Sequence, residues 1–417
     1  MKYLAVLGRQ PEISIAEIEA QCLAGPVATF SPTVLGSRLR AAGVPQVASP
    51  AHFEFISDIE PKIDRFGGVL KLAIELEKKP LEFLQELPEG KITIGVSDYS
   101  KNASRRTAAM EALKLKKILV RHGRSVRVVE NKDATLSTAT SLHNGLSGKN
   151  KRKVELIKAN NDWYKVIGVQ DIDAYTKRDQ ARPARDAKVG MLPPKLAQIL
   201  INLCGPLPEG ATVLDPFCGT GVVLQEALLM GYRACGTDIS EKMVEYSEKN
   251  LKWLLKSRDI LFSGHFGGCC RELALEPRKD GREGRGTENK NKIFEIATGD
   301  ATSYKWDRPI DAVACEGYLG KPFAKIPSEM ELKEQKQECG VIVLGFLKNL
   351  IGQIKPGTPV TIAVPAWLRE NSSYERLDIV DEIENMGYNV ENKSREGLLY
   401  HRDNQVVARD IIILRKK

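Results

Sequence analysis

The sequence has 417 residues, of which 42% are hydrophobic and 28% are charged, an ordinary composition for a globular chain. A chain of this length exceeds what one hydrophobic core usually organises, so we expect two or three domains. The apolar runs at residues 197–203 and 341–347 are far shorter than the roughly 18 residues that a membrane span needs. The apolar stretch at residues 3–7 lacks a cleavage site after it, so we expect a cytoplasmic protein without a membrane segment.

Positive charge is distributed unevenly along the chain. Residues 1–187 carry 30 Lys and Arg against 22 Asp and Glu, whereas residues 188–417 carry 32 of each, so the whole net charge of +8 lies in the first part. Residues 101–187 alone hold 20 basic and 9 acidic side chains. A basic module joined to a neutral one favours a polyanion held by the first and chemistry carried out by the second.

Eight cysteines are scattered along the chain, and none forms a C-x-x-C pair. This spacing argues against a zinc ribbon and against a disulfide framework. We therefore expect reduced thiols and no metal ion.

Residues 1–60 are predicted to form a small α+β segment. Residues 3–7 have the pattern of a strand, and Ser14 followed three residues later by Glu17 matches the capping box that begins a helix. Residues 61–175 are predicted to form a second α+β layer that includes a basic helix at residues 103–122. Its strands are expected at residues 91–96, 125–129, 154–158 and 163–170.

The polar, arginine-rich residues 176–189 are predicted to link this region to a domain at residues 190–417. Strands are expected there at 212–217, 233–239, 294–298, 310–315 and 359–364, and helices at 196–203, 222–230, 241–255, 341–354 and 375–386. This alternation is typical of a doubly wound, mostly parallel α/β sheet. The chain should close with an antiparallel hairpin formed by residues 389–400 and 406–414, and residues 257–292 are predicted to be a flexible insertion.

A ligand-binding site is expected where the first strand of this domain ends. Residues 215–221, with the sequence DPFCGTG, lead from a buried strand through a glycine turn into a helix. In an open α/β sheet, ligands bind at this edge. Gly219 and Gly221 lack the Cβ atoms that would keep a ligand away from the backbone amides, and the N-terminus of the following helix favours a carboxylate or a phosphate.

Two further acids end the next two predicted strands. Asp238 lies 23 positions after Asp215, where an acid can accept hydrogen bonds from both ribose hydroxyls, and Asp300 would lie near the adenine. Three acids on successive strand ends fit S-adenosylmethionine. A dinucleotide would require Gly in place of Leu224, and a P-loop would require a lysine that is missing. The expected cofactor-binding residues are Asp215, Phe217, Gly219, Gly221, Asp238, Ile239, Asp300, Ala301 and Pro193.

These motifs, together with Arg182 and Pro183 and the sequence GMLPPKLA at residues 190–197, resemble a known family. It is the archaeal-type family of class I tRNA guanosine N2-methyltransferases that carry an N-terminal THUMP domain. The resemblance implies a Rossmann-like, S-adenosylmethionine-dependent enzyme that methylates the exocyclic amine of a guanosine in tRNA. It also implies that residues 1–60 are ferredoxin-like and that residues 61–175 form a THUMP-like RNA-binding domain.

The fourth predicted strand departs from the family pattern. Base-amine methyltransferases commonly place Asp or Asn, two prolines and an aromatic residue there, whereas this chain has Cys315, Glu316, Gly317 and Tyr318. With Tyr318 aligned to the aromatic residue, Cys315 takes the position of the acid and Glu316 comes one residue late. We expect Glu316 to face the amine and to stabilise the charge that develops on nitrogen, Gly317 to offer a carbonyl, and Tyr318 to stack on the base.

The basic region supplies candidate contacts with the phosphates of a folded RNA. Few aromatic residues are interleaved with the basic ones, which favours recognition of RNA shape over stacking along a single strand. The candidates are Lys101, Arg105, Arg106, Lys114, Lys117, Arg121, Lys151 and Arg152.

Three interpretations therefore stand. The first is an S-adenosylmethionine-dependent RNA methyltransferase that acts on tRNA. The second keeps the cofactor and changes the substrate to DNA. The third is a tRNA-binding protein that has lost turnover, which the altered fourth strand suggests. The sequence leaves open an accessory protein subunit and the number of methyl groups added.

Overall fold

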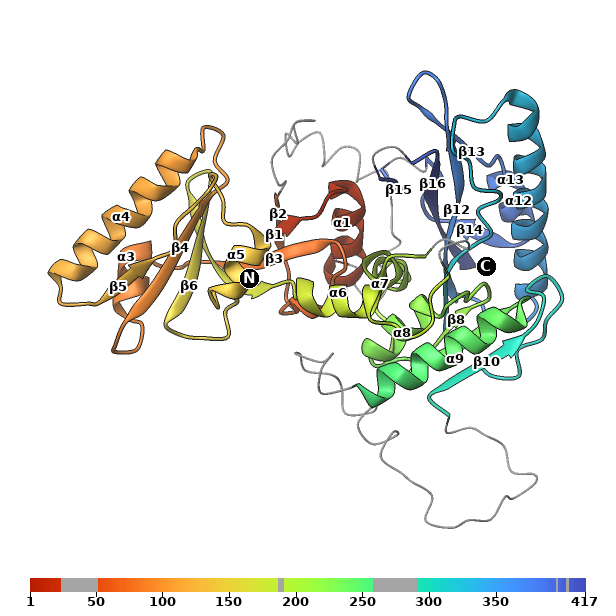
Figure 1. Ribbon diagram of the computed structural model, residues 1–417, viewed down its shortest axis with the longest axis horizontal. Helices are drawn as coiled ribbons and strands as arrows, with labels where there is room; N and C mark the ends of the chain where they lie inside the picture. The colour runs from red at the N-terminus through yellow and green to blue at the C-terminus, as the bar shows by residue number, and fades with distance from the viewer. Residues whose placement is uncertain (24–51, 187–190, 258–291, 395–396, 403–404) are drawn as a thin grey trace, which may run out of the picture. The chain divides into compact units, whose positions relative to one another are not determined.

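The computed structural model describes residues 1–23, 52–186, 191–257, 292–394, 397–402 and 405–417 (Figure 1). The chain divides into two compact units, Met1–Ile18 with Ala42–Asp173, and Glu19–Ala41 with Ala174–Lys417. The division near residue 173 falls close to the start of the predicted linker. The interior of the predicted insertion, residues 258–291, lies outside the described residues.

The first unit is built on one seven-stranded sheet. Its strands are β1 (Lys2–Leu7), β2 (His52–Ile56), β3 (Val69–Glu75), β4 (Ile92–Asp98), β5 (Val126–Val128), β6 (Lys153–Ala159) and β7 (Asp162–Val169). They lie in the order β2-β1-β3-β7-β6-β4-β5. The strand β4 pairs in parallel with β5 and β6, and the other pairs of this sheet are antiparallel. Strands from both sides of residue 60, where the sequence analysis places a division, thus belong to one continuous sheet.

The basic helix expected at residues 103–122 is confirmed as α4 (Arg105–Arg121). Ser104 caps it, because the Ser104 hydroxyl accepts a hydrogen bond from the Thr107 amide and the Thr107 hydroxyl accepts one from the Ser104 amide. Its apolar face, which includes Leu115 and Leu119, packs on β4 and β5. The remaining helices of this unit are α1 (Pro11–Ile18), α3 (Pro80–Gln85), α5 (Thr138–His143) and the 3-10 helix η2 (Ile63–Arg65). The π-helix η1 (Glu19–Leu23) follows α1 in the chain and belongs to the second unit.

The predicted capping box at Ser14 and Glu17 is wrong. The helix α1 begins earlier, at Pro11, and both residues lie buried within it. Their side chains bind another segment instead. The Glu17 oxygens accept hydrogen bonds from the amides of Gly67 and Gly68, each at 2.8 Å, and the Ser14 hydroxyl donates to the Gly68 carbonyl at 2.9 Å. The sequence spacing of a capping box is present here, but its polar groups serve a long-range contact.

The second unit contains a nine-stranded sheet. Its strands are β8 (Thr212–Asp215), β9 (Arg233–Asp238), β10 (Phe294–Thr298), β11 (Ala312–Glu316), β12 (Pro359–Leu368), β13 (Tyr374–Arg376), β14 (Tyr388–Val390), β15 (Leu399–Tyr400) and β16 (Val407–Lys416). The main path runs β10-β9-β8-β11-β12-β16-β14, with β13 paired to β12 and β15 paired to β16. The first five strands of that path are parallel, and β16 is antiparallel to β12. The predicted doubly wound, mostly parallel sheet with an antiparallel end is confirmed. In place of the single strand predicted at residues 389–400, the short strands β14 and β15 each pair antiparallel with β16.

Helices cover both faces of this sheet (Figure 1). They are α7 (Pro194–Asn202), α8 (Val222–Leu229), α9 (Glu241–Lys256), α12 (Glu329–Leu350) and α13 (Val380–Asn385). The helix α6 (Ile172–Gln180) is bound to α8, where Arg178 pairs with Glu226 at 2.7 Å. Cys235 of β9 packs in the core with α12, whereas the adjacent Ala234 packs with α8 and α9. This alternation of neighbouring side chains is what a strand with helices on both faces requires.

Two predicted helices of this unit have different bounds. The helix expected to begin at residue 341 begins at Glu329, where Ser328 and Glu331 form a capping box. The helix expected at residues 375–386 is wrong in its first part, because Tyr374–Arg376 pair with β12 as a strand and α13 begins only at Val380. The linker predicted at residues 176–189 is helical up to Gln180.

We expect Glu17→Ala to lower the free energy of unfolding by about 3 kcal/mol, because two buried amides lose their acceptor. Urea denaturation measures the change, and Glu89→Ala, at an exposed position of the same unit, is the control with little effect. Equal midpoints for the two variants would show that the contact between Glu17 and the two glycines contributes nothing to stability.

Candidate active site

The turn after β8 requires glycine at two positions. Gly219 and Gly221 have φ angles of +49° and +79°, in the left-handed region where other residues are strained. A Cβ atom on Gly221 would also lie 2.8 Å from Ser247 Oγ. The Cys218 amide donates to the Thr237 carbonyl at 2.9 Å, which holds the turn against the end of β9. The predicted glycine turn is therefore formed at the carboxyl end of β8.

Asp238, the last residue of β9, is bound to this turn. Its Oδ2 accepts a hydrogen bond from the Gly219 amide and its Oδ1 accepts one from the Ser240 amide, each at 2.9 Å. Carboxylate oxygens have more than one acceptor direction, so both can accept further bonds. The next residue, Ile239, is 75% exposed. It offers an apolar surface directly beside the carboxylate.

Two polar residues of α9 form hydrogen bonds with the backbone of the turn. Ser247 Oγ donates to the Gly219 carbonyl at 2.8 Å. Asn250 Nδ2 lies 2.9 Å from the Thr220 carbonyl and 2.9 Å from the Ala184 carbonyl, while its Oδ1 accepts from the Ala184 amide at 3.0 Å. Asn250 was not among the residues predicted for the site. Its signal is a polar residue three positions after Ser247, on the apolar face of an amphipathic helix.

Asp215, the last residue of β8, is buried, and burial raises the pKa of its carboxyl group well above the usual value. A hydrogen bond from the Phe217 amide, 3.2 Å from Oδ1, acts in the opposite direction. The charges of Asp238 and Glu316 raise the pKa of Asp215 further. The carboxylates of Asp238 and Glu316, at the ends of the two strands that flank β8, thus lie near enough to act on Asp215.

Asp300 and Ala301 follow the neighbouring strand, β10. Asp300 is exposed, and its Oδ1 accepts hydrogen bonds from the Thr302 amide at 2.9 Å and the Thr302 hydroxyl at 2.8 Å. These bonds lower the pKa of Asp300. Ala301 is buried, and its carbonyl accepts from Asn349 Nδ2 of α12 at 2.9 Å. Asp300 therefore shapes the turn after β10, and its role in cofactor binding stays a prediction.

Two other predicted cofactor residues have structural contacts. The Phe217 ring meets the Phe346 ring of α12 edge-on, with 5.3 Å between the ring centroids. Pro193 is the residue before α7, and its carbonyl accepts from the Leu196 amide at 2.9 Å. Their contact with a cofactor is likewise a prediction.

The predicted fourth strand is β11, and the contacts at its end show why residues 316 and 317 are not prolines. Cys315 is fully buried in the core, and burial raises the pKa of its thiol, so it does not replace the acid of the family pattern. The Gly317 amide donates to the Ala363 carbonyl at 2.9 Å, a bond that proline could not make. Glu316 lies at the strand end, and Arg409 of β16 donates to its Oε1 at 2.8 Å. Glu316 is therefore the carboxylate at the end of β11.

The loop after Gly317 is held on α12. Tyr318 is 36% exposed, and burial together with the adjacent Glu338 carboxylate raises the pKa of its hydroxyl. The Lys321 amide donates to Gln335 Oε1 at 2.7 Å. Gly320 has a φ angle of +79°, and a Cβ atom there would strike the Gln335 side chain. These contacts fix the loop while leaving part of Tyr318 open.

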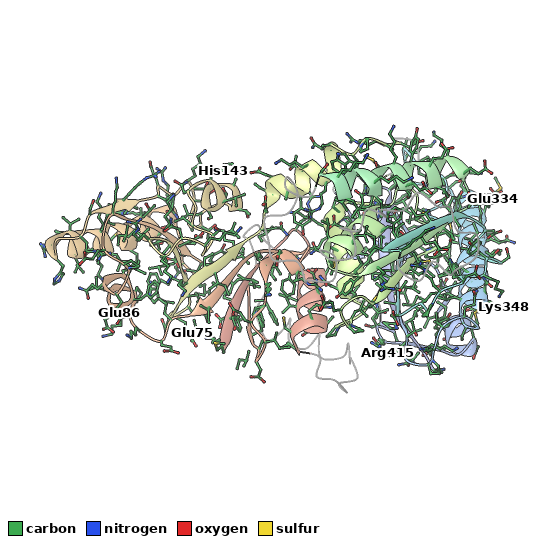
Figure 2. All side chains as sticks on the ribbon, turned by 90° about the horizontal axis from the view of Figure 1, so that it is seen from below. Glu75, Glu86, His143, Glu334, Lys348 and Arg415 are labelled. Carbon is green, nitrogen blue, oxygen red and sulfur yellow. The ribbon has the colours of Figure 1, made fainter. Side chains whose placement is uncertain are left out.

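All eight predicted RNA contacts are exposed side chains of the first unit. Five of them, Arg105, Arg106, Lys114, Lys117 and Arg121, lie on α4. Arg105 pairs with Glu130 at 2.9 Å. Figure 2 shows the side chains of the described residues in place on the ribbon. Exposure is what contact with phosphates requires, and the contact itself stays a prediction.

Within the described residues, no group of three His, Cys, Asp or Glu side chains is arranged to hold a metal ion. Nor does this part of the chain contain a helix with the length and hydropathy of a membrane span.

Two family models match parts of the chain. A model described as "RMKL-like, methyltransferase domain" matches residues 182–317, and a model described as "DNA methylase" matches residues 111–249. The first range contains the glycine turn, Asp238 and Glu316. Each range is about a third of the chain.

Curated relatives that match the chain include enzymes named as tRNA methyltransferases. The chain is 47% identical over 192 residues to the tRNA (guanine(10)-N2)-dimethyltransferase of Methanothermobacter thermautotrophicus, a match that covers 46% of this chain and 44% of the relative. It is 47% identical over 62 residues to the enzyme of the same name from Pyrococcus abyssi, covering 15% of this chain and 18% of the relative. The chain thus spans less than half the length of these relatives. Among solved structures, TrmN from Thermus thermophilus aligns over 100% of both chains with 15% identity and a TM-score of 0.41.

Asp215→Asn should stabilise the fold in a pH-dependent way. A carboxyl group whose pKa is raised by folding costs stability as the pH rises above its value in the unfolded chain, about 3.9. The amide removes that cost and keeps the shape of the side chain. We expect the melting temperature of the variant to exceed that of the unaltered chain at pH 8, with the gain vanishing towards pH 4.

Thermal unfolding between pH 4 and pH 8 measures this gain, and Asp307→Asn, at an exposed position of the same unit, is the matched control. A gain that does not change with pH, or a loss of stability at pH 8, would contradict the account of Asp215.

Proposed function

We propose that this chain is an S-adenosylmethionine-dependent RNA methyltransferase that modifies the exocyclic amine of a guanosine in tRNA. The observation that carries the proposal is the arrangement around the end of β8, where the glycine turn and Asp238 of β9 lie on one side and Glu316 of β11 on the other, at one edge of a parallel sheet. The matches to a methyltransferase-domain family and to relatives named as tRNA guanine dimethyltransferases support it.

The edge of the sheet fits a sulfonium nucleoside. Asp238 has acceptor positions left for the ribose hydroxyls, and exposed Ile239 offers an apolar surface for the adenine. The buried carboxyl group of Asp215, with the Asp238 carboxylate near it, favours a ligand that carries positive charge. When bound, S-adenosylmethionine supplies a methyl group activated by a positively charged sulfur. The protein must hold that ligand and keep the target amine in line with it.

Glu316 and Tyr318 are proposed to hold the target base. The Glu316 carboxylate would accept a hydrogen bond from the amine and stabilise the positive charge that develops on its nitrogen. The exposed part of Tyr318 would stack on a base that is unpaired or flipped from its helix. The Gly317 carbonyl, at the end of the strand, would be a second acceptor for the amine.

The first unit is proposed to bind the tRNA. It carries the exposed basic residues of α4 together with Lys101, Lys151 and Arg152. Its proposed division is a ferredoxin-like segment at residues 1–60 and a THUMP-like domain at residues 61–175. Phosphate contacts of this kind would position the RNA, while the second unit would select the base.

A second candidate function keeps the cofactor and changes the polymer to DNA. The match of residues 111–249 to a DNA methylase model favours it. The two candidates differ only in the nucleic acid that accepts the methyl group.

Asp238→Ala should abolish detectable binding of S-adenosylmethionine in isothermal titration calorimetry, because the ribose would lose its acceptor and the turn would lose the bond to Gly219. Asp307→Ala, at an exposed position of the same unit, is the control and should bind the cofactor with unchanged affinity. Unchanged affinity in Asp238→Ala would refute this placement of the cofactor.

Nucleoside mass spectrometry tests the whole proposal. The full chain is incubated with isotope-labelled S-adenosylmethionine and either tRNA or duplex DNA. We expect labelled N2-methylguanosine or N2,N2-dimethylguanosine from the tRNA alone, and at least a 100-fold loss of rate for Glu316→Ala. Label in DNA alone would favour the second candidate, and label in neither would refute both.

A further inference from the structure

An arginine from another strand reaches the proposed catalytic carboxylate. Arg409 lies on β16, which is separated from β11 by β12, and its Nε donates to Glu316 Oε1 at 2.8 Å. Both side chains are sheltered, with 9% of Arg409 and 17% of Glu316 exposed. A charge pair that is largely removed from water is held more strongly than a pair on the surface.

The sheet sets the geometry of this pair. Ala363 of β12 lies opposite Glu316, and Pro365, two residues further, lies opposite Arg409. A second, longer contact joins Arg409 Nη1 to Gln405 Oε1 at 3.5 Å. The position of the Glu316 carboxylate is thus set by backbone pairing across three strands.

Arg409 also fixes which way the side chain at position 316 is turned. Arginine carries donors and no acceptor, so it holds an acceptor oxygen of that side chain toward itself. Among the described residues, Arg409 is the one side chain that hydrogen-bonds to Glu316. The free edge of the carboxylate therefore presents acceptors at the end of β11, beside Gly317 and Tyr318.

We propose that the Arg409–Glu316 pair determines the base specificity of the site, by fixing Glu316 as the acceptor of two neighbouring N–H groups. Guanine offers such a pair, N1–H and the exocyclic amine. Adenine and cytosine place their amine beside a bare ring nitrogen, whose lone pair would face the carboxylate. This inference rests on the proposed function, and in it Arg409 is a positioning residue that acts through Glu316.

Two synthetic tRNAs test the pair. They carry either guanosine or 2-aminopurine riboside at the position that the unaltered chain methylates. Both bases have the 2-amine, but N1 of 2-aminopurine is bare. We expect kcat/KM to favour guanosine by about 10- to 100-fold, the range of a good two-bond contact with a base edge.

The Glu316→Gln variant should reverse this preference. Arg409 would hold the amide oxygen, so the amide NH₂ would face the base and donate to a bare N1. We expect the ratio of kcat/KM values, guanosine over 2-aminopurine, to fall below one. Adding Arg409→Gln to Glu316→Gln removes the constraint on the amide and should bring the ratio close to one. Arg409→Gln alone should lower the ratio of the unaltered chain, and Arg409→Lys should restore part of it.

Arg415→Gln is the matched control. Arg415, labelled in Figure 2, lies six residues along β16. Its Nε donates to Glu391 Oε1 at 2.7 Å. Its partner on β12 is Pro359, at the opposite end of the strand from the site. Its loss should leave the ratio unchanged. The ratio does not depend on how much protein is folded, so partial unfolding of a variant cannot imitate the result.

Four outcomes would contradict the specificity role or the proposed function. A ratio near one for the unaltered chain, or the same ratio in Glu316→Gln, would overturn the specificity role while leaving the proposed function intact. Equal effects of Arg409→Gln and Arg415→Gln on the ratio would also overturn it. Failure of the unaltered chain to methylate either RNA would contradict the proposed function, and this inference with it.

Discussion

The hydrogen bond between the Gly219 amide and the Asp238 carboxylate is the contact on which the candidate site depends. It joins the turn after β8 to the end of β9, and it requires a left-handed glycine in the turn. The α9 residues Ser247 and Asn250 hold the same turn from the other side. A parallel sheet brings the ends of β8, β9 and β11 to one edge, and this bond gives that edge a defined shape.

The second constraint at this edge is charge. Three carboxylates gather there, and burial makes ionised Asp215 costly in the free protein. One of the three, Glu316, already has a positive partner in Arg409. The other two face the turn that we propose to hold the cofactor. A buried carboxylate such as Asp215 lowers the stability of the free protein, and such groups are common where a protein binds a positively charged ligand.

Most of the features that the sequence could predict depend on patterns of neighbouring residues. The strand, glycine turn and helix at residues 212–230, and the acid at the end of the next strand, depend on neighbours in the chain, and the structure places them as expected. The capping box at Ser14 failed because the same residue types serve a contact with Gly67 and Gly68, some fifty residues away.

The support of the site was beyond sequence reasoning for the same reason. Arg409 reaches Glu316 from 93 residues away, and only the order of strands in the sheet brings them together. Gly317 stands where the family pattern has a proline, and its amide donates a hydrogen bond to the Ala363 carbonyl of β12. The departure of the fourth strand from the family pattern is thus matched by contacts that a proline-rich motif could not make.

The account depends most on where the cofactor lies. Nuclear magnetic resonance of the full chain with selectively labelled isoleucine methyl groups and S-adenosylmethionine measures this directly. The account predicts cross-relaxation between the adenine ring protons and the methyl groups of Ile239, assigned by its loss in Ile239→Val. Bound cofactor whose adenine shows contacts only with methyl groups elsewhere would contradict it.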